Sequence, residues 1–365
     1  MSRPARVVID LNAARDNLRR VRTLAPRSRL MAVVKADAYG HGLTRMAAAF
    51  AEADAFGVAC LDEAIALRKS GVAKPVVLLE GPFSAGETAE MHRYWLDTVV
   101  HSEEQIGMIE ALPGPPILDV WLKIDTGMHR LGFAPAAVPA AAARLGGCRA
   151  VRQPLRLMTH LASAHVRGDD SVERQLEVFE RLADGLGTGP AAGERCIANS
   201  AAIIGHRRAH AHWVRPGIML YGVSPYDDST AAMEGLRPVM TLRSELIAVH
   251  GLRAGDRVGY GGTWTCPEDM PVGVVAMGYG DGYPRHAAAG TPVLVKGRRA
   301  ALIGRPSMDM LMVDLRAVAD ARVGDSVVLW GEGVPVEEVA RHAGTIPYQL
   351  LCSMRMRLDF EVLGG

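Results

Sequence analysis

A lysine ends a short apolar run near the start of the chain, and its position suggests covalent chemistry. Residues 31–34 read as a buried strand that leads into Lys35, a glycine-bounded turn follows at 36–42, and a helical pattern occupies 43–50. Apolar surroundings disfavour an ammonium ion and lower the pKa of the amine. A neutral amine is the nucleophile that Schiff-base chemistry requires. An ion pair between Lys35 and Asp37, or an amine extended into solvent, explains the same pattern without chemistry.

Polar residues follow several later apolar runs in the same way. They are Asp125-Thr126-Gly127, His160, Asn199-Ser200 and Arg215-Pro216-Gly217. Arg130 lies just beyond the first group, and a guanidinium is always charged and forks to the paired oxygens of a carboxylate or phosphate. Ser200 precedes a helical pattern, whose first N–H groups favour a phosphate. Taken singly, Arg130 also fits a rim ion pair, and His160 also fits a structural histidine.

Alternating strands and helices must position these residues. Strand patterns lie at 30–34, 55–59, 76–79, 98–100, 117–123, 155–160, 196–198 and 213–215, with helical patterns such as 61–70, 103–112, 134–145 and 171–186 between them. An earlier strand at 7–10 precedes a first amphipathic helix, for which Asp10 or Asn12 is the expected cap. Eight strand–helix units predict a (β/α)8 barrel, in which catalytic groups lie at the C-terminal ends of the strands.

The pattern changes at about residue 235, where closely spaced strands replace the alternation. These strands are expected at 240–250, 272–277, 292–295, 310–314 and 326–329, with one late helix at 336–342. The predicted fold class is therefore α/β: an N-terminal (β/α)8 TIM-like barrel over residues 1–235, followed by a mainly β C-terminal domain over residues 236–365.

Composition excludes several functional classes. The 365 residues carry a net charge of only +1, which gives no electrostatic basis for binding nucleic acid or an acidic membrane. Five scattered cysteines without a C-x-x-C pattern indicate reduced thiols, and the N-terminus has no apolar signal region, so we expect a cytoplasmic protein. His206, His210 and His212 could in principle bind a metal, but Arg207 and Arg208 favour a solvated loop, and no metal site is predicted.

Several segments together resemble one enzyme family. Residues 32–42, AVVKADAYGHG, resemble the cofactor-lysine segment of the alanine racemases, fold-type III enzymes that use pyridoxal 5'-phosphate (PLP). Segments similar to others of that family follow in the family's order: KIDTGMHRLG at 123–132, RPGI at 215–218, GYGDGYPR at 278–285 and RPSMD at 305–309. The resemblance thus covers nearly the whole chain. It implies a barrel joined to a β domain, with the first strand of the chain, about residues 1–10, packed in the second domain.

The resemblance also implies roles for particular residues. Lys35 and Tyr260 would be the two catalytic bases, one on each face of the substrate. The implied PLP-binding residues are Lys35, Tyr39, Arg130, His160, Ser200, Arg215, Gly217, Ile218 and Tyr348, and the implied substrate-binding residues are Arg130, Tyr279 and Met308. The family forms homodimers, in which Tyr260 and Met308 would be contributed across the interface. Lys123 matches a position that is carbamylated in some members, and His165 replaces an acidic residue often found near the substrate entrance.

The resemblance implies PLP-dependent interconversion of L-alanine and D-alanine. A broad-specificity amino-acid racemase on the same fold is an alternative, although some of those act outside the cytoplasm. A PLP decarboxylase is another alternative, but that activity typically places a cysteine near the substrate, where this chain has Ser307. A non-catalytic PLP carrier would have the barrel alone, and the second domain argues against it.

Overall fold

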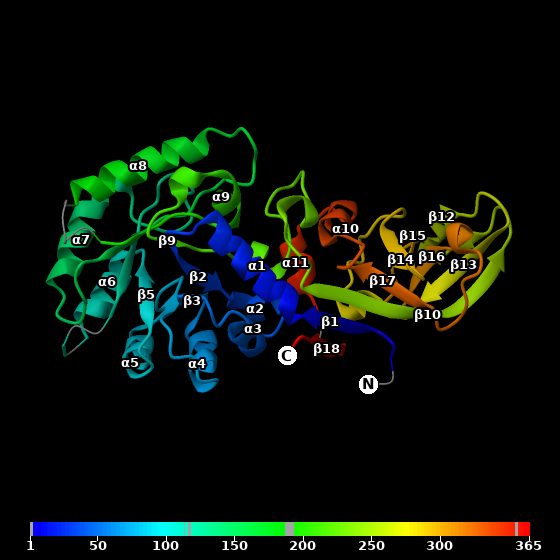
Figure 1. The fold of residues 1–365 in the computed structure, drawn as a ribbon, viewed down its shortest axis with the longest axis horizontal. Coiled ribbons are helices and arrows are strands. Elements are labelled where there is room, and N and C mark those ends of the chain that lie inside the picture. Colours follow the sequence, from blue (N-terminus) through cyan, green and yellow to red (C-terminus); the bar gives the residue numbers. More distant parts are fainter. Residues whose placement is uncertain (1–2, 113, 116–117, 187–192, 355–356) are drawn as a thin grey trace.

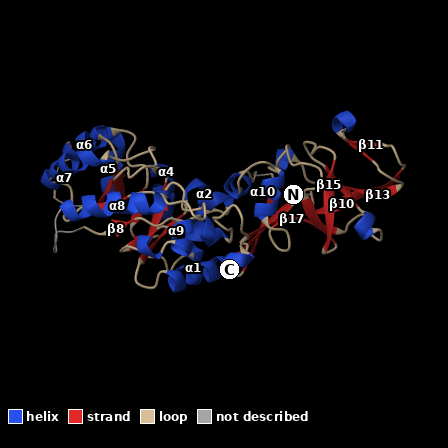
Figure 2. Cartoon of the chain, turned by 90° about the horizontal axis from the view of Figure 1, so that it is seen from above, coloured by secondary structure: helices blue, strands red, loops and turns tan. Residues whose placement is uncertain are grey.

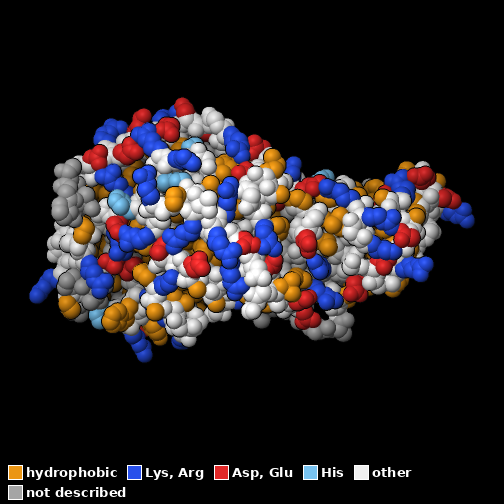
Figure 3. Space-filling model, in the orientation of Figure 1, with side chains coloured by type: hydrophobic (Ala, Val, Ile, Leu, Met, Phe, Trp, Pro, Cys, Tyr) orange, Lys and Arg blue, Asp and Glu red, His pale blue; other side chains and the backbone are white. Residues whose placement is uncertain are grey.

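The computed structural model describes residues 3–112, 114–115, 118–186, 193–354 and 357–365. A barrel wrapped by helices forms one end of an elongated molecule, and a strand-rich body forms the other (Figure 1). Viewed from above, helices surround the strands of the first body, whereas strands predominate in the second (Figure 2). On the face shown in Figure 3, basic and acidic side chains are interspersed, in keeping with the small net charge.

Eight parallel strands close into a barrel in sequence order, so the predicted fold class is confirmed. They are β2 (Arg29–Val33), β3 (Ala55–Val58), β4 (Val76–Leu78), β5 (Asp97–Val100), β6 (Val120–Lys123), β7 (Arg156–Met158), β8 (Arg195–Cys196) and β9 (Trp213–Val214). Each overlaps a predicted strand; residue 117, where the fifth was expected to begin, lies outside the described residues. One side chain from each strand fills the barrel: Met31, Ala55, Val77, Val99, Trp121, Met158, Cys196 and Trp213.

The helices cover the barrel with their apolar faces. They are α1 (Leu11–Leu24), α3 (Leu43–Ala49), α4 (Leu61–Lys69), α5 (Ala85–Arg93), α6 (Glu103–Glu110), α7 (Val138–Gly147), α8 (Ser171–Gly185) and α9 (Ser200–Gly205). Asp10 is the cap of the first helix, because its carboxylate accepts from the N–H groups of Asn12 and Ala13 at 2.8 and 3.0 Å. In the parts of the chain that the structure describes, no helix combines the length and apolar character needed to cross a bilayer.

The second body is built on a mixed sheet. Its order is β13-β16-β15-β14-β17-β10-β1-β18, and β13 also pairs with β10. The strands are β1 (Arg6–Asp10), β10 (Met240–Leu252), β13 (Met270–Val275), β14 (Pro292–Val295), β15 (Arg298–Ile303), β16 (Leu311–Asp314), β17 (Ser326–Trp330) and β18 (Asp359–Leu363), with a small separate hairpin of β11 (Arg257–Val258) and β12 (Trp264–Thr265). The first strand of the chain thus lies in this sheet, antiparallel to β10 and parallel to β18.

The helices of the second body differ in part from expectation. The predicted helix at 336–342 is confirmed as α10 (Val336–His342), but the expectation of one helix is wrong, because α11 (Pro347–Cys352) follows it. Six residues are too few to show a helical period, although a proline at the first helical position is typical of a helix start. This second helix carries Tyr348 toward the barrel.

Buried polar contacts join the two bodies. The carboxylate of Glu337 on α10 accepts from the backbone N–H groups of Ser224 and Ala231, both at 2.8 Å. Asn17 on α1 donates to the carbonyls of Leu220 and Arg237 at 3.2 and 2.8 Å. The predicted boundary at residues 235/236 lies between two of these partners, Ala231 and Arg237, shortly before β10 begins at Met240.

Candidate active site

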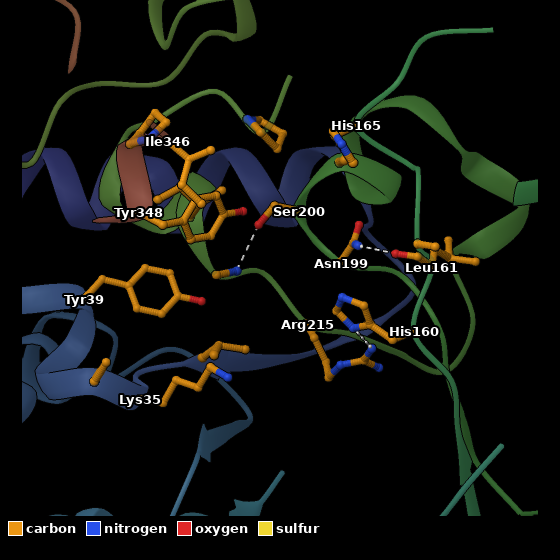
Figure 4. Close-up of a pocket in the computed structure, with 18 of the residues that line it drawn as sticks. Lys35, Tyr39, His160, Leu161, His165, Asn199, Ser200, Arg215, Ile346 and Tyr348 are labelled. Atoms are coloured by element: carbon orange, nitrogen blue, oxygen red, sulfur yellow. Dashed lines mark hydrogen bonds between the residues drawn. The ribbon is translucent and has the colours of Figure 1, made fainter. Parts of the chain in front are cut away.

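A cavity of about 1110 Å³ opens at the C-terminal ends of the barrel strands. The structure places there all nine residues expected to bind a cofactor: Lys35, Tyr39, Arg130, His160, Ser200, Arg215, Gly217, Ile218 and Tyr348. Eight of them come from loops and turns that follow barrel strands, whereas Tyr348 reaches the cavity from α11. Figure 4 shows Lys35, Tyr39, Arg215 and Tyr348 directed toward a shared space.

Lys35 enters the cavity with its amine accessible. Its side chain is 38% exposed, and Nζ lies 3.8 Å from the carboxylate of Glu80. The amine therefore lies where the cavity opens, as expected for a lysine at the end of a buried strand. The alternative pairing with Asp37 is not observed, since that carboxylate accepts from the backbone N–H of Leu43 at 2.7 Å.

The turn after Lys35 is left-handed, which the sequence did not predict. Four consecutive residues, Ala36 to Tyr39, have φ between +52 and +55°, and Gly40 follows at +77°. Left-handed backbone is unfavourable for residues with a Cβ. Contacts offset the cost: Glu63 accepts from the N–H of Ala36 at 2.6 Å, and the carbonyl of Asp37 accepts from Gly42 at 2.9 Å.

The glycine that ends this turn is required by packing as well as by its φ. A Cβ on Gly40 would lie 2.3 Å from the carbonyl oxygen of Leu351 on α11. The turn beyond the lysine therefore packs directly on the helix that carries Tyr348. A larger residue here would separate the two walls of the cavity.

Arg215 and His160 form the floor of the cavity (Figure 4). The guanidinium donates to the carbonyls of Thr159 and Cys196 at 2.7 and 3.0 Å, and its Nη2 lies 3.3 Å from Nδ1 of His160. Burial, followed by the charges of Arg215 and Lys123, lowers the pKa of His160 well below its usual range. A neutral ring that accepts at Nδ1 carries its proton on Nε2 and can donate from there.

Lys123 adds a further basic group beside this floor. Burial, followed by the charges of Arg215 and Arg130, lowers its pKa to about 7. Lys35 and Arg130 also line the cavity, so several basic side chains converge on one space. Such a cavity favours a ligand with several negative charges.

Hydroxyl groups gather at the opposite side of the cavity. Ser200 accepts from the N–H of Gly217 at 2.9 Å. Tyr39 packs against Tyr348 with ring centroids 5.8 Å apart, and burial raises the pKa of both phenols, that of Tyr348 to about 12. A Cβ on Gly217 would lie only 2.7 Å from the Tyr39 hydroxyl, so the glycine keeps this corner open. Neutral phenols and a serine hydroxyl can all donate to a phosphate.

Some residues of the cavity were not anticipated. Glu80 follows the apolar strand β4 much as Lys35 follows β2, so the same sequence pattern predicts its place at the cavity. Cys196 lies under Arg215, with Sγ 3.0 Å from the guanidinium, and its position inside the barrel hid it among core residues. His165, in contrast, was expected near the substrate entrance, and it lies at the rim of the same cavity together with Ile346.

Three predicted site residues lie outside this cavity. Tyr260, Tyr279 and Met308 belong to loops of the second body, and they are 69%, 37% and 53% exposed. Short 3-10 turns carry the two tyrosines, at Tyr260–Gly262 and Tyr279–Asp281. Within one chain, these groups do not meet Lys35.

The histidine cluster is engaged with the backbone. Nε2 of His210 lies 2.9 Å from the carbonyl of Ile203, and Nδ1 of His212 accepts from the N–H of Arg195 at 3.1 Å. Among the described residues, no group of three or more potential ligands could hold a metal ion.

In sequence and in fold, the chain is similar to alanine racemases. Residues 9–225 match the alanine racemase N-terminal domain, and residues 239–362 match the C-terminal domain. The alanine racemase of Nitrosococcus oceani is 54% identical over 352 residues, which cover 96% of this chain and 97% of that protein. The crystal structure of the biosynthetic alanine racemase from Pseudomonas aeruginosa has a TM-score of 0.95 and 46% identity, with 99% of this chain and 100% of that chain covered.

A more distant solved structure supports the same relationship. Alanine racemase from Acinetobacter baumannii is 36% identical, with a TM-score of 0.91 and 99% of each chain covered. Both domains and the order of the segments are therefore shared along the full length. The chain belongs to the alanine racemase family.

Proposed function

We propose that this protein interconverts L-alanine and D-alanine with PLP as its cofactor. The observation that carries the proposal is that Lys35 lies at the end of a barrel strand and enters a cavity with Arg215 and His160. The hydroxyl groups of Ser200, Tyr39 and Tyr348 line the same cavity. Full-length relatives that are alanine racemases support the same reaction.

The cavity fits PLP in its size and in its donor set. Lys35 would take the aldehyde, and Ser200, Tyr39, Tyr348 and the backbone N–H groups of Gly217 and Ile218 would hold the phosphate. The corner beside Gly217, which a Cβ would fill, is the observation that favours a ligand group there. Bound PLP would supply an electron-withdrawing system that acidifies the α-hydrogen of the substrate amino acid.

Arg215 and Arg130 have separate roles in this proposal. Arg215 would face the pyridine nitrogen, and because arginine barely gives up its proton, it offers that nitrogen a hydrogen bond without protonating it. Arg130 lies at the cavity wall and would hold oxygen atoms of the cofactor and of the substrate carboxylate.

The α-proton would move between the substrate and two bases. Nζ of Lys35 would remove or return it on the face used by D-alanine, and the phenolic oxygen of Tyr260 would do so on the face used by L-alanine. The neutral His160, which accepts from Arg215 and carries its proton on Nε2, would donate toward that phenol. Positive charge around His160 favours the ionised form of a nearby phenol.

A second copy of the chain would complete the site. Tyr260, Tyr279 and Met308 lie outside the cavity of their own chain and expose large apolar surfaces, as does Met310, which is 44% exposed. A head-to-tail homodimer would bring Tyr260 and Met308 of one chain to the cavity of the other, where the N–H of Met308 would bind the substrate carboxylate and Tyr279 would contact the substrate. Five free thiols favour a cytoplasmic location.

The test is D-alanine formation by the PLP-loaded protein, followed by NMR or polarimetry against a panel of amino acids. Lys35→Ala should reduce the rate by several orders of magnitude without unfolding the protein, and Lys69→Ala, on the outer surface of α4, is the matched control. Borohydride reduction and peptide mass analysis should place the cofactor on Lys35. Attachment to another lysine with full activity would refute the assignment, and equal rates on many amino acids would indicate a broad-specificity racemase.

A further inference from the structure

A buried carboxylate in the second body binds both ends of the chain. The side chain of Asp281 is completely buried, and it forms ion pairs with Arg3 at 3.2 Å and with Arg357 at 2.7 Å. Arg3 precedes the first strand, and Arg357 precedes the last. Asp309 completes the cluster, since its carboxylate pairs with Arg357 and lies 3.6 Å from Arg3. We call these four residues the terminal clamp.

The clamp lies directly behind two loops of the proposed substrate site. Asp281 caps the first loop by accepting from the N–H of Gly278 at 2.9 Å. Arg3 also donates to the carbonyl of Asp309 in the second loop at 3.0 Å. Tyr279 follows Gly278 in the first loop, and Met308 precedes Asp309 in the second. The clamp thus holds the backbone on both sides of Tyr279 and directly after Met308.

The two loops form one unit through their backbones. The N–H of Tyr279 donates to the carbonyl of Ser307 at 3.0 Å, and the N–H of Gly280 donates to that of Met308 at 2.8 Å. A Cβ on Gly278 would lie 2.2 Å from the carbonyl oxygen of Met308, so only glycine permits this approach. Movement of one loop must therefore displace the other.

We propose that Arg3 and Arg357 are positioning residues that set where Tyr279 and Met308 meet the substrate in the partner subunit. This inference rests on the proposed function. A carboxylate without solvent contact holds its place only while its cationic partners remain, because an uncompensated buried charge is strongly unfavourable. Loss of either guanidinium would draw Asp281 toward water and shift the loop that it caps. The two ends of one chain would thereby control substrate binding in the other chain.

The test uses Arg3→Gln, Arg357→Gln and Arg357→Lys in the PLP-loaded dimer. Both glutamine variants should raise the KM for alanine by roughly 10- to 100-fold, with a smaller change in kcat, because a displacement of about 1 Å can have that effect on a site. Arg357→Lys keeps the positive charge but lacks the forked donors of a guanidinium. Its KM should therefore lie between those of the wild type and Arg357→Gln. PLP affinity and dimer mass should stay at wild-type values. Arg253→Gln, which breaks the exposed pair with Asp269, is the matched control.

Hydrogen exchange measured by mass spectrometry gives a second readout that needs no activity. Peptides spanning residues 278–283 and 305–310 should exchange faster in both glutamine variants, while barrel peptides should not change. If both glutamine variants of an active enzyme show unchanged exchange or an unchanged KM, the positioning role of the clamp is overturned. The proposed function would then still stand. Failure of the wild-type holoenzyme to racemise alanine would instead overturn the proposed function and the catalytic part of the clamp with it. A loss of PLP affinity as large as the rise in the KM for alanine would show a merely structural role and would overturn the proposal.

Discussion

The guanidinium of Arg215 lies 3.3 Å from Nδ1 of His160 while it is also held by three backbone carbonyls, those of Thr159, Cys196 and Ile197. These contacts fix the arginine, and through it they fix both the tautomer and the charge of the imidazole. Burial and the nearby cations keep the pKa of His160 low, so the ring stays neutral at physiological pH.

Arg215→Gln should raise the pKa of His160 toward its ordinary value, because one of the charges that oppose protonation is gone. Arg215→Lys should keep much of the low pKa but lose the forked contacts. Histidine resonances in a labelled protein, followed through a pH titration, measure the difference. A pKa for His160 that is identical in the wild type and Arg215→Gln would show that burial alone sets it.

Lys123→Met should change how stability depends on pH. The pKa of Lys123 is about 7 in the folded chain and 10.5 ordinarily, so between these values the unfolded chain binds the extra proton. The free energy of unfolding of the wild type should therefore include a contribution that rises from pH 7 to pH 10.5 and is constant below pH 7. The methionine variant should lack this contribution.

Urea unfolding at several pH values compares Lys123→Met with the surface control Lys69→Met. The buffers must be free of carbon dioxide, because carbamylation of Lys123 would replace a neutral amine with an anion beside Arg130 and Arg215. Parallel stability curves for the wild type and Lys123→Met would contradict the low pKa.

Gly217→Ala should weaken PLP binding without unfolding the barrel. The new Cβ would lie 2.7 Å from the hydroxyl of Tyr39, which packs against other aromatic rings and cannot retreat freely. Overpacking of this kind costs about 1–3 kcal/mol, which corresponds to roughly 10- to 100-fold in affinity. Gly146→Ala in α7 is the control, since no other group lies near its Cβ. Equal PLP affinity in both variants would show that Gly217 does not lie beside the phosphate of PLP.

The sequence predicted the barrel well because each strand is a short apolar run bounded by polar or glycine residues, and a lysine or histidine at the end of such a run is conspicuous. Two features of the cavity could not be predicted in this way. The left-handed turn after Lys35 depends on Glu63 and on the backbone of α11, which are distant in sequence. The exposed fraction of the Lys35 side chain depends on how far the cavity opens, which no local pattern encodes.

The second body was predicted less completely. β15 begins with two arginines, and most of β18 is at least partly exposed at the sheet edge, so neither shows the alternation of a half-buried strand. The pairing of β18 with β1, and the clamp between Arg3, Asp281 and Arg357, join residues from opposite ends of the chain. Only the folded structure brings them together.

Tyr260→Phe should abolish one of two separate proton transfers. PLP binding should survive, because the cofactor contacts come from the cavity and Tyr260 lies outside it. Racemisation must fall equally in both directions, by roughly 100-fold or more, since a catalyst cannot shift an equilibrium and a positioned base typically contributes that much. In deuterated water, exchange of the α-hydrogen should continue for D-alanine through Lys35 and should be nearly lost for L-alanine. Equal loss for both enantiomers would count against two bases.

A mixture of Lys35→Ala and Tyr260→Phe chains tests whether the tyrosine comes from the partner subunit. Each variant alone lacks one base in every site, so each homodimer should be inactive. In a hybrid dimer, the cavity of the Tyr260→Phe chain retains Lys35 and would receive Tyr260 from the Lys35→Ala chain, which restores one complete site. The other cavity would lack both bases. A fully mixed sample should therefore regain about one quarter of the wild-type rate, because half of its dimers are hybrids with one intact site each. Mass spectrometry of the native dimers establishes that hybrids have formed. Hybrids without activity would show that Tyr260 does not act across the interface. Regained activity, in contrast, requires that Tyr260 of one chain acts together with Lys35 of the other chain in one site.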